Sequence, residues 1–293
     1  MASAQLRDTR RRIRSVEAIK KITRAMELIS TSRIPKAQAR VNASKPYTEK
    51  LIEVIENVGA AGAAMSHPLL ERREIQTVGL LVVSSDRGLA GSYASNVIRL
   101  AEGRIRQLDR DGKDVALYVV GKKAQAYFRY RGYRIENAYL GVTDTPGYGD
   151  ARAIANKTLA DFATDKIDSL EASFTRYQSA LNQVPTQLEL LPITPPAMGD
   201  QERAHRVSYE FEPSPEEILD RLLPRYVEAT IFNMLLEASA SEHSARRKAM
   251  KAATDNAEDL IRVLRVQANR ARQAEITTAI SEIVGGAEAL TKG

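Results

Sequence analysis

Two long stretches of helical hydrophobic periodicity, one at each end of the chain, enclose a middle region with a different pattern. In the first stretch, apolar residues recur at steps of mostly three or four, the spacing of one stripe on an α-helix. The remaining faces are charged, so the pattern predicts a helix over residues 1–58 that packs against one partner along one seam. We expect a kink or joint at Pro35, because proline removes a backbone hydrogen bond. The expected seam residues are Leu6, Ile13, Val16, Ile19, Ile22, Met26 and Ile29.

The second long helix has a clear start signal in EPSPEEIL. Ser214 can cap the helix, Pro215 suits its first position, and Glu217 completes a capping box. We expect Pro224 to separate a short first piece. No other breaker occurs before Gly285 and Gly286, about 60 residues later, which corresponds to roughly 90 Å at ~1.5 Å per residue. A helix of this length requires another long helix as its partner, and the N-terminal helix is the one available.

The side chains expected to point inward from the second helix are large at both of its ends and mostly small in its middle. Small side chains allow two helices to approach closely, which favours a thin seam in the middle of the pair. These positions are Ile231, Leu235, Leu236, Ala245, Ala249, Met250, Ala253, Ala257, Leu260, Leu264, Ile276, Ile280, Ile283 and Val284.

The middle region alternates between short apolar runs, typical of buried strands, and helical patterns. This alternation predicts a Rossmann-like layered α/β domain over residues 75–211, flanked by the helical segments 1–58 and 214–293. Residues 192–203 are expected to form a surface excursion of undetermined role. Strands are expected at residues 77–85, 114–121, 134–140, 172–177, 186–191 and 207–211, and helices at 94–108, 121–131 and 150–163.

Two glycine-containing turns raise the question of nucleotide binding. SSDRGLAGSY places Gly88 and Gly91 in the first strand-to-helix turn, where a phosphate could meet a helix N-terminus. The spacing lacks the GxGxxG fingerprint, so it favours a tight turn that packs helix on strand. The GKK motif at Gly121 lacks the upstream glycine and the trailing Ser or Thr of a phosphate loop. The sequence therefore offers no nucleotide site that we expect to function.

Composition excludes several further kinds of chemistry. The chain has no cysteine, and its three histidines, His67, His205 and His243, are widely scattered, so we expect no metal site and no cofactor. No Ser, His and Asp arrangement indicates a nucleophile, and we expect no catalytic residue. No apolar run approaches the ~18 residues of a membrane span, and the basic N-terminus precedes no apolar segment. We therefore expect a cytoplasmic protein that is at most peripheral on a membrane.

The positive charge is concentrated in one segment. Residues 1–50 carry 13 Lys and Arg against 4 Asp and Glu, whereas the whole chain has a net charge of +6. Three interpretations are open: a helical arm that binds nucleic acid phosphates, a solvated helix face, or a surface that faces an acidic protein. The arm lacks the aromatic residues that single-strand binders place between their cations.

Four motifs in this order resemble the gamma subunit of the F-type ATP synthase, the central rotor shaft. They are ITRAMELISTSR, SSDRGLAGSYASN, EHSARRKAMKAATDNAEDLI and ARQAEITTAISEIVGGAEAL, and the resemblance covers nearly the whole chain. The resemblance implies that the N- and C-terminal helices form an antiparallel coiled coil beside the α/β domain. It also implies a non-catalytic subunit, one copy per complex, on the cytoplasmic face of the cell membrane.

The resemblance further implies partners and a mechanical role. The coiled coil is expected to stand inside a ring of alpha and beta subunits, and the α/β domain to meet the epsilon subunit and the membrane c-ring, with no nucleic acid partner. Rotation driven by proton flow would then be coupled to conformational change in the catalytic beta subunits, with an influence on ATPase activity and proton flow.

Individual residues are assigned by the same resemblance. Met26, Arg246, Gln273, Thr277 and Glu282 are expected to contact the alpha and beta subunits, and Tyr209 and Phe211 to contact epsilon and the c-ring. Simpler roles remain open, because Met26 can serve only in seam packing, and Arg246 and Glu282 can be ordinary solvated charges.

Overall fold

The computed structural model describes residues 2–60, 67–194 and 214–291. It divides into two compact units, which we name the helix-pair unit (residues 1–30 and 246–293) and the α/β unit (residues 31–245). Two long helices, α1 (Ala2–Ala60) and α6 (Pro215–Thr291), contribute residues to both units. Within the part of the chain that the structure describes, no helix is long and apolar enough to cross a membrane.

Both long helices pass through their prolines without interruption, so the separate first piece expected before Pro224 and a joint at Pro35 are wrong, whereas a kink at Pro35 stays a prediction. Pro35 and Pro46 lie inside α1, and Pro224 lies inside α6, which also continues beyond Gly285 and Gly286 to Thr291. A proline's fixed φ is compatible with a helix, and the hydrogen bond that it removes is offset here by buried neighbours such as Ile34 and Leu223. Glycine in a helix interior costs about 1 kcal/mol, which weakens a helix but does not end it.

The predicted helix start at Ser214 is confirmed. The backbone N–H of Glu217 donates to Ser214 Oγ at 3.3 Å, the cap that the EPSPEEIL motif predicts. This bond satisfies one of the donors that the first turn of a helix leaves without an intrahelical partner.

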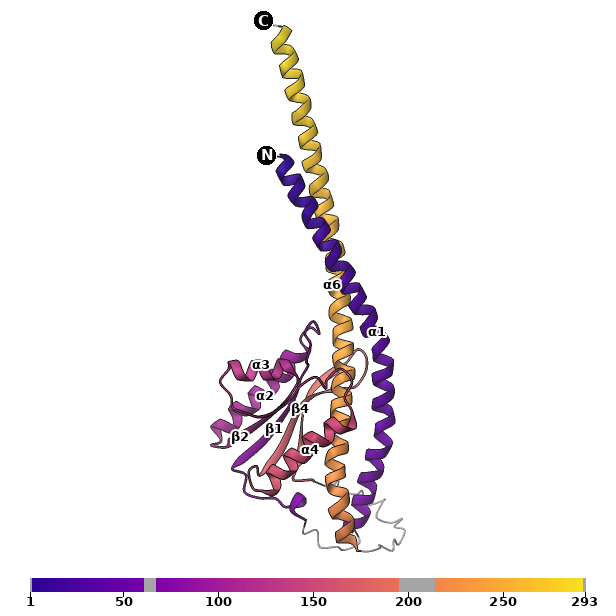
Figure 1. Cartoon of the computed structure of the whole chain (residues 1–293), viewed down its shortest axis with the longest axis vertical. Coiled ribbons are helices and arrows are strands. Elements are labelled where there is room, and N and C mark those ends of the chain that lie inside the picture. The colour runs from indigo at the N-terminus through magenta and orange to yellow at the C-terminus, as the bar shows by residue number, and fades with distance from the viewer. Residues whose placement is uncertain (1, 61–66, 195–213, 292–293) are drawn as a thin grey trace. The chain divides into compact units, whose positions relative to one another are not determined.

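The described residues of the α/β unit form a five-stranded sheet in the order β3-β2-β1-β4-β5 (Figure 1). Strands β1 to β4 are parallel, and β5 pairs with β4 in antiparallel fashion. We refer to residues 67–194, which hold the sheet, as the sheet domain. Its elements are the short 3-10 helix η1 (Pro68–Leu70), strands β1 (Thr77–Val83), β2 (Asp114–Val120), β3 (Ile135–Tyr139), β4 (Ser169–Tyr177) and β5 (Gln183–Leu191), and helices α2 (Tyr93–Arg110), α3 (Lys122–Tyr130) and α4 (Tyr148–Ala163).

Helices cover both faces of this sheet, which explains its nearly uninterrupted apolar strands. Leu80 and Val82 of β1 pack against α2 and α3 on one face. The alternate residues Leu81 and Val83 join a core on the other face with α4 and the first part of α6. The predicted α/β class and the order of its elements are thereby confirmed, except that the predicted strand at residues 207–211 lies outside the described residues.

Candidate functional site: the helix pair and the sheet edge

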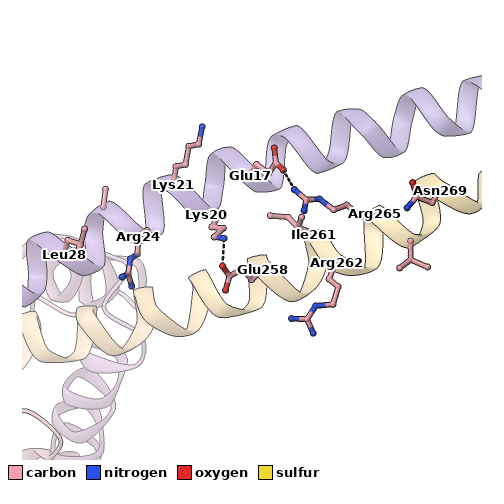
Figure 2. Close-up of a pocket in the computed structure, with 12 residues that line it drawn as sticks. Glu17, Lys20, Lys21, Arg24, Leu28, Glu258, Ile261, Arg262, Arg265 and Asn269 are labelled. Atoms are coloured by element: carbon pink, nitrogen blue, oxygen red, sulfur yellow. Dashed lines mark hydrogen bonds and ion pairs between the residues drawn. The ribbon is translucent and has the colours of Figure 1, made fainter. Parts of the chain in front are cut away.

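The N-terminal part of α1 and the C-terminal part of α6 run antiparallel in the helix-pair unit. The hydroxyls of Thr23 and Thr254 lie 2.8 Å apart. Lys20 forms an ion pair with Glu258, and Arg265 Nη2 donates to Glu17 at 3.0 Å. Figure 2 shows these two charge pairs bridging the helices. Because the partner numbers rise on α6 as they fall on α1, the predicted antiparallel arrangement is confirmed.

The seam of this pair has the 3-4 spacing of a coiled coil. Along α6, the buried positions are Met250, Thr254, Ala257, Ile261, Leu264 and Ala268. On α1, Leu6, Thr23 and Ser30 are buried, and Ile13 and Val16 are half-buried. A side chain from one helix can thus enter a space between side chains of the other at every turn.

Several residues predicted for the seam lie outside it. Ile19, Ile22 and Ile29 are 53%, 60% and 53% exposed. Hydroxyl and small residues, including Thr23 and Ser30, take the central positions instead, and this shifts the seam by one residue around α1. Leu260, Ile276, Ile280, Ile283 and Val284 of α6 are also exposed. Figure 1 shows α6 continuing past the N-terminal end of α1, and among the described residues no other helix lies beside this last part of α6.

One side of the helix pair forms a basic groove of about 1080 Å³. Ala25, Leu28, Ile261 and Val266 supply apolar surface to it. Five cations and two carboxylates surround that surface, so the groove has an excess of positive charge. The charged lining residues, all labelled in Figure 2, are Lys20, Lys21, Arg24, Arg262, Arg265, Glu17 and Glu258.

In the α/β unit, α6 lies against the sheet edge where many α/β proteins bind ligands. That edge is formed by the carboxyl ends of the strands at the point where the strand order reverses, here between β1 and β4. Tyr93 Oη, in the first turn of α2, donates to the carbonyl of Ala238 at 3.1 Å. Ser241 Oγ donates to the carbonyl of Thr175 at the end of β4 at 3.3 Å. The chain's own helix therefore contacts the edge that a nucleotide would need.

The second glycine turn is explained by close backbone packing. Gly121 has φ +94°, and a Cβ placed there would lie 2.8 Å from the carbonyl of Ser85. Asp86 Oδ1 accepts from the backbone N–H of Lys122 at 3.1 Å, so a carboxylate already occupies the N-terminus of α3. This arrangement disfavours phosphate binding at the GKK motif.

The residues assigned by resemblance are spread along the helices and do not converge on one site. Met26 is half-buried on α1, and Arg246 is buried on α6. Gln273, Thr277 and Glu282 are exposed on the last part of α6. Tyr209 and Phe211 lie outside the described residues.

Thr23 and Thr254 were missed by sequence reasoning, together with the Lys20–Glu258 pair. A search for seam positions three and four residues apart would have identified the two threonines if it had allowed small and hydroxyl side chains as well as large apolar ones.

These features define a class of protein in which two long helices form an antiparallel pair and also flank an α/β domain. The family model described as ATP synthase matches residues 5–290. The ATP synthase gamma chain of Frankia casuarinae is 49% identical over 99% of both chains, and that of Mycolicibacterium smegmatis is 46% identical over 98% of both. The chain belongs to the ATP synthase gamma chain family, whose members are non-catalytic subunits of the enzyme.

Solved structures show the same fold at much lower identity. A chain in the Euglena gracilis mitochondrial ATP synthase structure of OSCP, F1 and c-ring aligns with a TM-score of 0.68 at 15% identity, covering 98% of this chain and 95% of the other. A chain in the Tetrahymena thermophila central stalk and c-ring structure aligns with a TM-score of 0.59 at 21% identity, covering 79% and 99%. Long helices flanking an α/β domain are thus shared across these distant chains.

Proposed function

We propose that this chain is the rotating central-stalk subunit that couples proton-driven rotation of a membrane c-ring to ATP synthesis in the beta subunits of its complex. The observation that carries the proposal is the antiparallel helix pair, whose seam is narrow and whose outer faces retain exposed apolar residues. Membership in the gamma chain family supports the same role. The partners are the alpha, beta and epsilon subunits and the c-ring, and the location is the cytoplasmic face of the cell membrane.

A rotating shaft must present different surfaces to identical neighbours in turn. The basic groove lies on one side of the helix pair, so the pair has no rotational symmetry of charge. A beta subunit that faces the groove meets cations and apolar surface, and its neighbours meet other faces. This difference in contact biases each beta subunit toward a different conformation, which is coupling between sites through a rigid element.

The helix pair must transmit enough energy for the synthesis of ATP without one helix sliding along the other. Each unit charge that crosses ~100 mV supplies about 2.3 kcal/mol, so several crossings must be summed for one ATP. The Thr23–Thr254 hydrogen bond and the two charge pairs resist sliding of one helix along the other. A pair with a fixed register can transmit the summed work.

Particular residues are proposed to make the contacts. Met26, Arg246, Gln273, Thr277 and Glu282 contact the alpha and beta subunits, whereas Tyr209 and Phe211 contact epsilon and the c-ring. In this proposal the chain has three functional parts, which are the helical segments 1–58 and 214–293 and an α/β domain over residues 75–211. Through these contacts the chain also influences ATPase activity and proton flow.

A tagged chain recovered from membranes in mild detergent tests this function. We expect alpha, beta, epsilon and c subunits in the eluate, together with ATPase activity. A variant with Ile276→Asn and Ile280→Asn removes two exposed apolar side chains, and Thr278→Asn on the same stretch of α6 is its control. We expect slower ATP hydrolysis by the complex for the first variant only. Recovery of nucleic acid, or of the chain alone, would contradict the rotor function.

A further inference from the structure

The loop between β3 and α4 makes polar contacts with both long helices inside the α/β unit. Arg33 Nη1, on α1, lies 2.5 Å from both carboxylate oxygens of Asp144. About two helical turns further along α1, Arg40 donates to the carbonyl of Pro146. From α6, Ser239 Oγ donates to the carbonyl of Asp144 at 3.1 Å. A single loop residue is therefore bonded to two helices that are distant in the sequence.

The same loop is held firmly to the sheet. The carboxylate of Asp86, just after β1, accepts from the N–H and the hydroxyl of Thr143 at 3.2 and 3.1 Å. The N–H of Asp86 in turn lies 3.1 Å from Thr143 Oγ1. Asp86 also accepts from Lys122 at the start of α3. Because Thr143 precedes Asp144 directly, these bonds fix the carboxylate relative to β1 and α3.

The surroundings of Asp144 keep it ionised. Burial tends to raise the pKa of its carboxyl group, but the hydrogen bond and charge of Arg33, together with Arg87 and His243, give a net lowering of this pKa. Arg87 Nη1 lies 3.9 Å from the carboxylate, and His243 Nε2 lies 3.8 Å from it. A charged carboxylate between cations forms stronger and more directional hydrogen bonds than a neutral group.

The other contacts between α6 and the sheet domain include single hydrogen bonds, at Ala238 and Ser241, and apolar packing. Leu223, Ile231 and Leu235 of α6 belong to the apolar core beneath the sheet. The hydrophobic effect is non-directional and depends mainly on the apolar area removed from water, whereas the close packing of side chains opposes displacement. Hydrogen bonds lose strength steeply when their angle changes, so they resist such movement. The polar ties at Asp144 add directional resistance to that of the packed core, and unlike the bonds at Ala238 and Ser241 they hold both α1 and α6.

We propose that Asp144 is a positioning residue that locks α1 and α6 to the sheet domain, so that rotation of the sheet domain is passed to both helices without slip. This inference rests on the proposed rotor function and adds a specific element to it. Asp144 acts through Arg33 and the backbone contact of Ser239, and it requires no contact of its own with another subunit.

The test uses the complete membrane complex carrying Asp144→Asn, reconstituted in vesicles. ATP hydrolysis and ATP-driven proton pumping are measured together while the opposing proton gradient increases. We expect the protons pumped per ATP to fall about threefold under a large gradient while hydrolysis changes less than about twofold, because a weakened tie slips under load. Asp165→Asn is the matched control, since it removes an ion pair with Arg73 inside the sheet domain. The control should pump like the parent.

A charge exchange strengthens the test. Arg33→Asp combined with Asp144→Arg should recover part of the pumping that either change alone removes, which a general loss of stability would not allow. If Asp144→Asn does not assemble, Arg33→Lys gives the same comparison, because it keeps the charge and changes the hydrogen-bonding geometry. Pumping equal to that of the parent in the assembled variant, under the same gradient, would overturn the role of Asp144.

Failure of this inference is distinguishable from failure of the proposed function. If the unmodified chain does not copurify with an ATPase that pumps protons, the rotor function itself is wrong. If the unmodified complex pumps normally and the Asp144 and Arg33 variants do so equally well under load, only the locking role is wrong.

Discussion

The hydroxyl oxygens of Thr23 and Thr254 lie 2.8 Å apart, at buried positions on two helices whose residues are 231 positions apart in the sequence. Thr254 Oγ1 also donates to the carbonyl of Met250 at 2.9 Å. Thr23 Oγ1 likewise donates to the carbonyl of Lys20 at 3.1 Å, so either hydroxyl can be the donor in the bond between the two threonines. The bond is directional and lies in the seam, so it fixes which turn of α1 faces which turn of α6.

A disulfide can test this register directly, because the chain contains no cysteine. We expect Thr23→Cys combined with Thr254→Cys to form an intramolecular disulfide under mild oxidation, since the two side chains already meet. Ile22→Cys with Thr254→Cys is the control, because Ile22 points away from the seam and is largely exposed. The measurement is the mobility shift on a non-reducing gel. Equal cross-linking in both variants would show that the helices slide past one another.

Two neighbouring residues of α6 provide a test of which face is buried. Ile261 is 7% exposed, whereas Leu260 beside it is 46% exposed. We expect Ile261→Ala to lower the free energy of unfolding by about 2–4 kcal/mol, because it leaves a cavity in the seam. Leu260→Ala should change it by less than about 0.5 kcal/mol. Urea unfolding followed by far-UV circular dichroism measures both, and a larger loss for Leu260→Ala would refute the observed seam.

Alanine substitutions at Gly121 and Gly112 distinguish the cost of close packing from the cost of a left-handed backbone conformation. Both have positive φ, +94° and +69°, but a Cβ at Gly121 would meet the backbone of Ser85 at 2.8 Å, whereas nothing lies within 4 Å of one at Gly112. We expect Gly112→Ala to cost about 1 kcal/mol, from the left-handed conformation alone. Gly121→Ala should cost about 3 kcal/mol or more, because Ser85 and β1 must also shift. Thermal unfolding compares the two, and equal losses would contradict the close approach.

The sequence predicted the α/β domain well because its elements are buried on both faces or along one clear stripe. Leu80, Leu81, Val82 and Val83 form an unbroken apolar run, and a parallel strand covered by helices on both sides requires such a run. The helices between the strands likewise bury one apolar side against the sheet. In this domain the apolar residues are therefore the ones that the chain itself buries.

The helix pair was predicted in existence and direction, but only part of its seam was placed correctly. Ile19, Ile22 and Ile29 were selected because they are large and apolar, yet Thr23 and Ser30 hold the buried positions. An apolar side chain is expected to be buried, but its hydrophobicity does not show whether its own chain or another subunit buries it. In a subunit proposed to turn inside a ring of other subunits, exposed isoleucines on the outer faces are suited to contacts with those subunits.

The prolines were misjudged for a related reason. Pro35 and Pro224 each remove one hydrogen bond locally, and a local rule therefore predicts a joint or a separate helical piece there. The buried residues at 3-4 spacing on both sides of Pro35 and Pro46 continue without a shift in phase, at Ile34, Val41, Leu51, Ile55 and Val58. Packing along the whole helix outweighs the local loss, and packing is not visible in a short window of sequence.

Glu237, on α6, gives a prediction about pH. Its carboxylate accepts from the backbone N–H of Tyr177 at 3.1 Å at the end of β4. Burial raises the pKa of Glu237, and this outweighs the lowering by the Tyr177 N–H and by the charges of Arg176 and Lys45. The folded state thus holds the proton to a higher pH than the unfolded state does. Glu237 therefore lowers stability above its folded pKa, and this penalty disappears as the pH falls below the unfolded pKa of about 4.3.

Glu237→Gln removes the charge and keeps an oxygen that can accept from Tyr177. We expect the substitution to raise the Tm at pH 8 and to have progressively less effect as the pH is lowered toward 4, because the glutamate is then neutral as well. Melting curves by circular dichroism between pH 4 and 8 measure the difference. Glu49→Gln, at an exposed position on α1, is the control for loss of a negative charge. A Tm difference for Glu237→Gln that is negative at pH 8, or that is the same at every pH, would show that burial does not control this carboxylate.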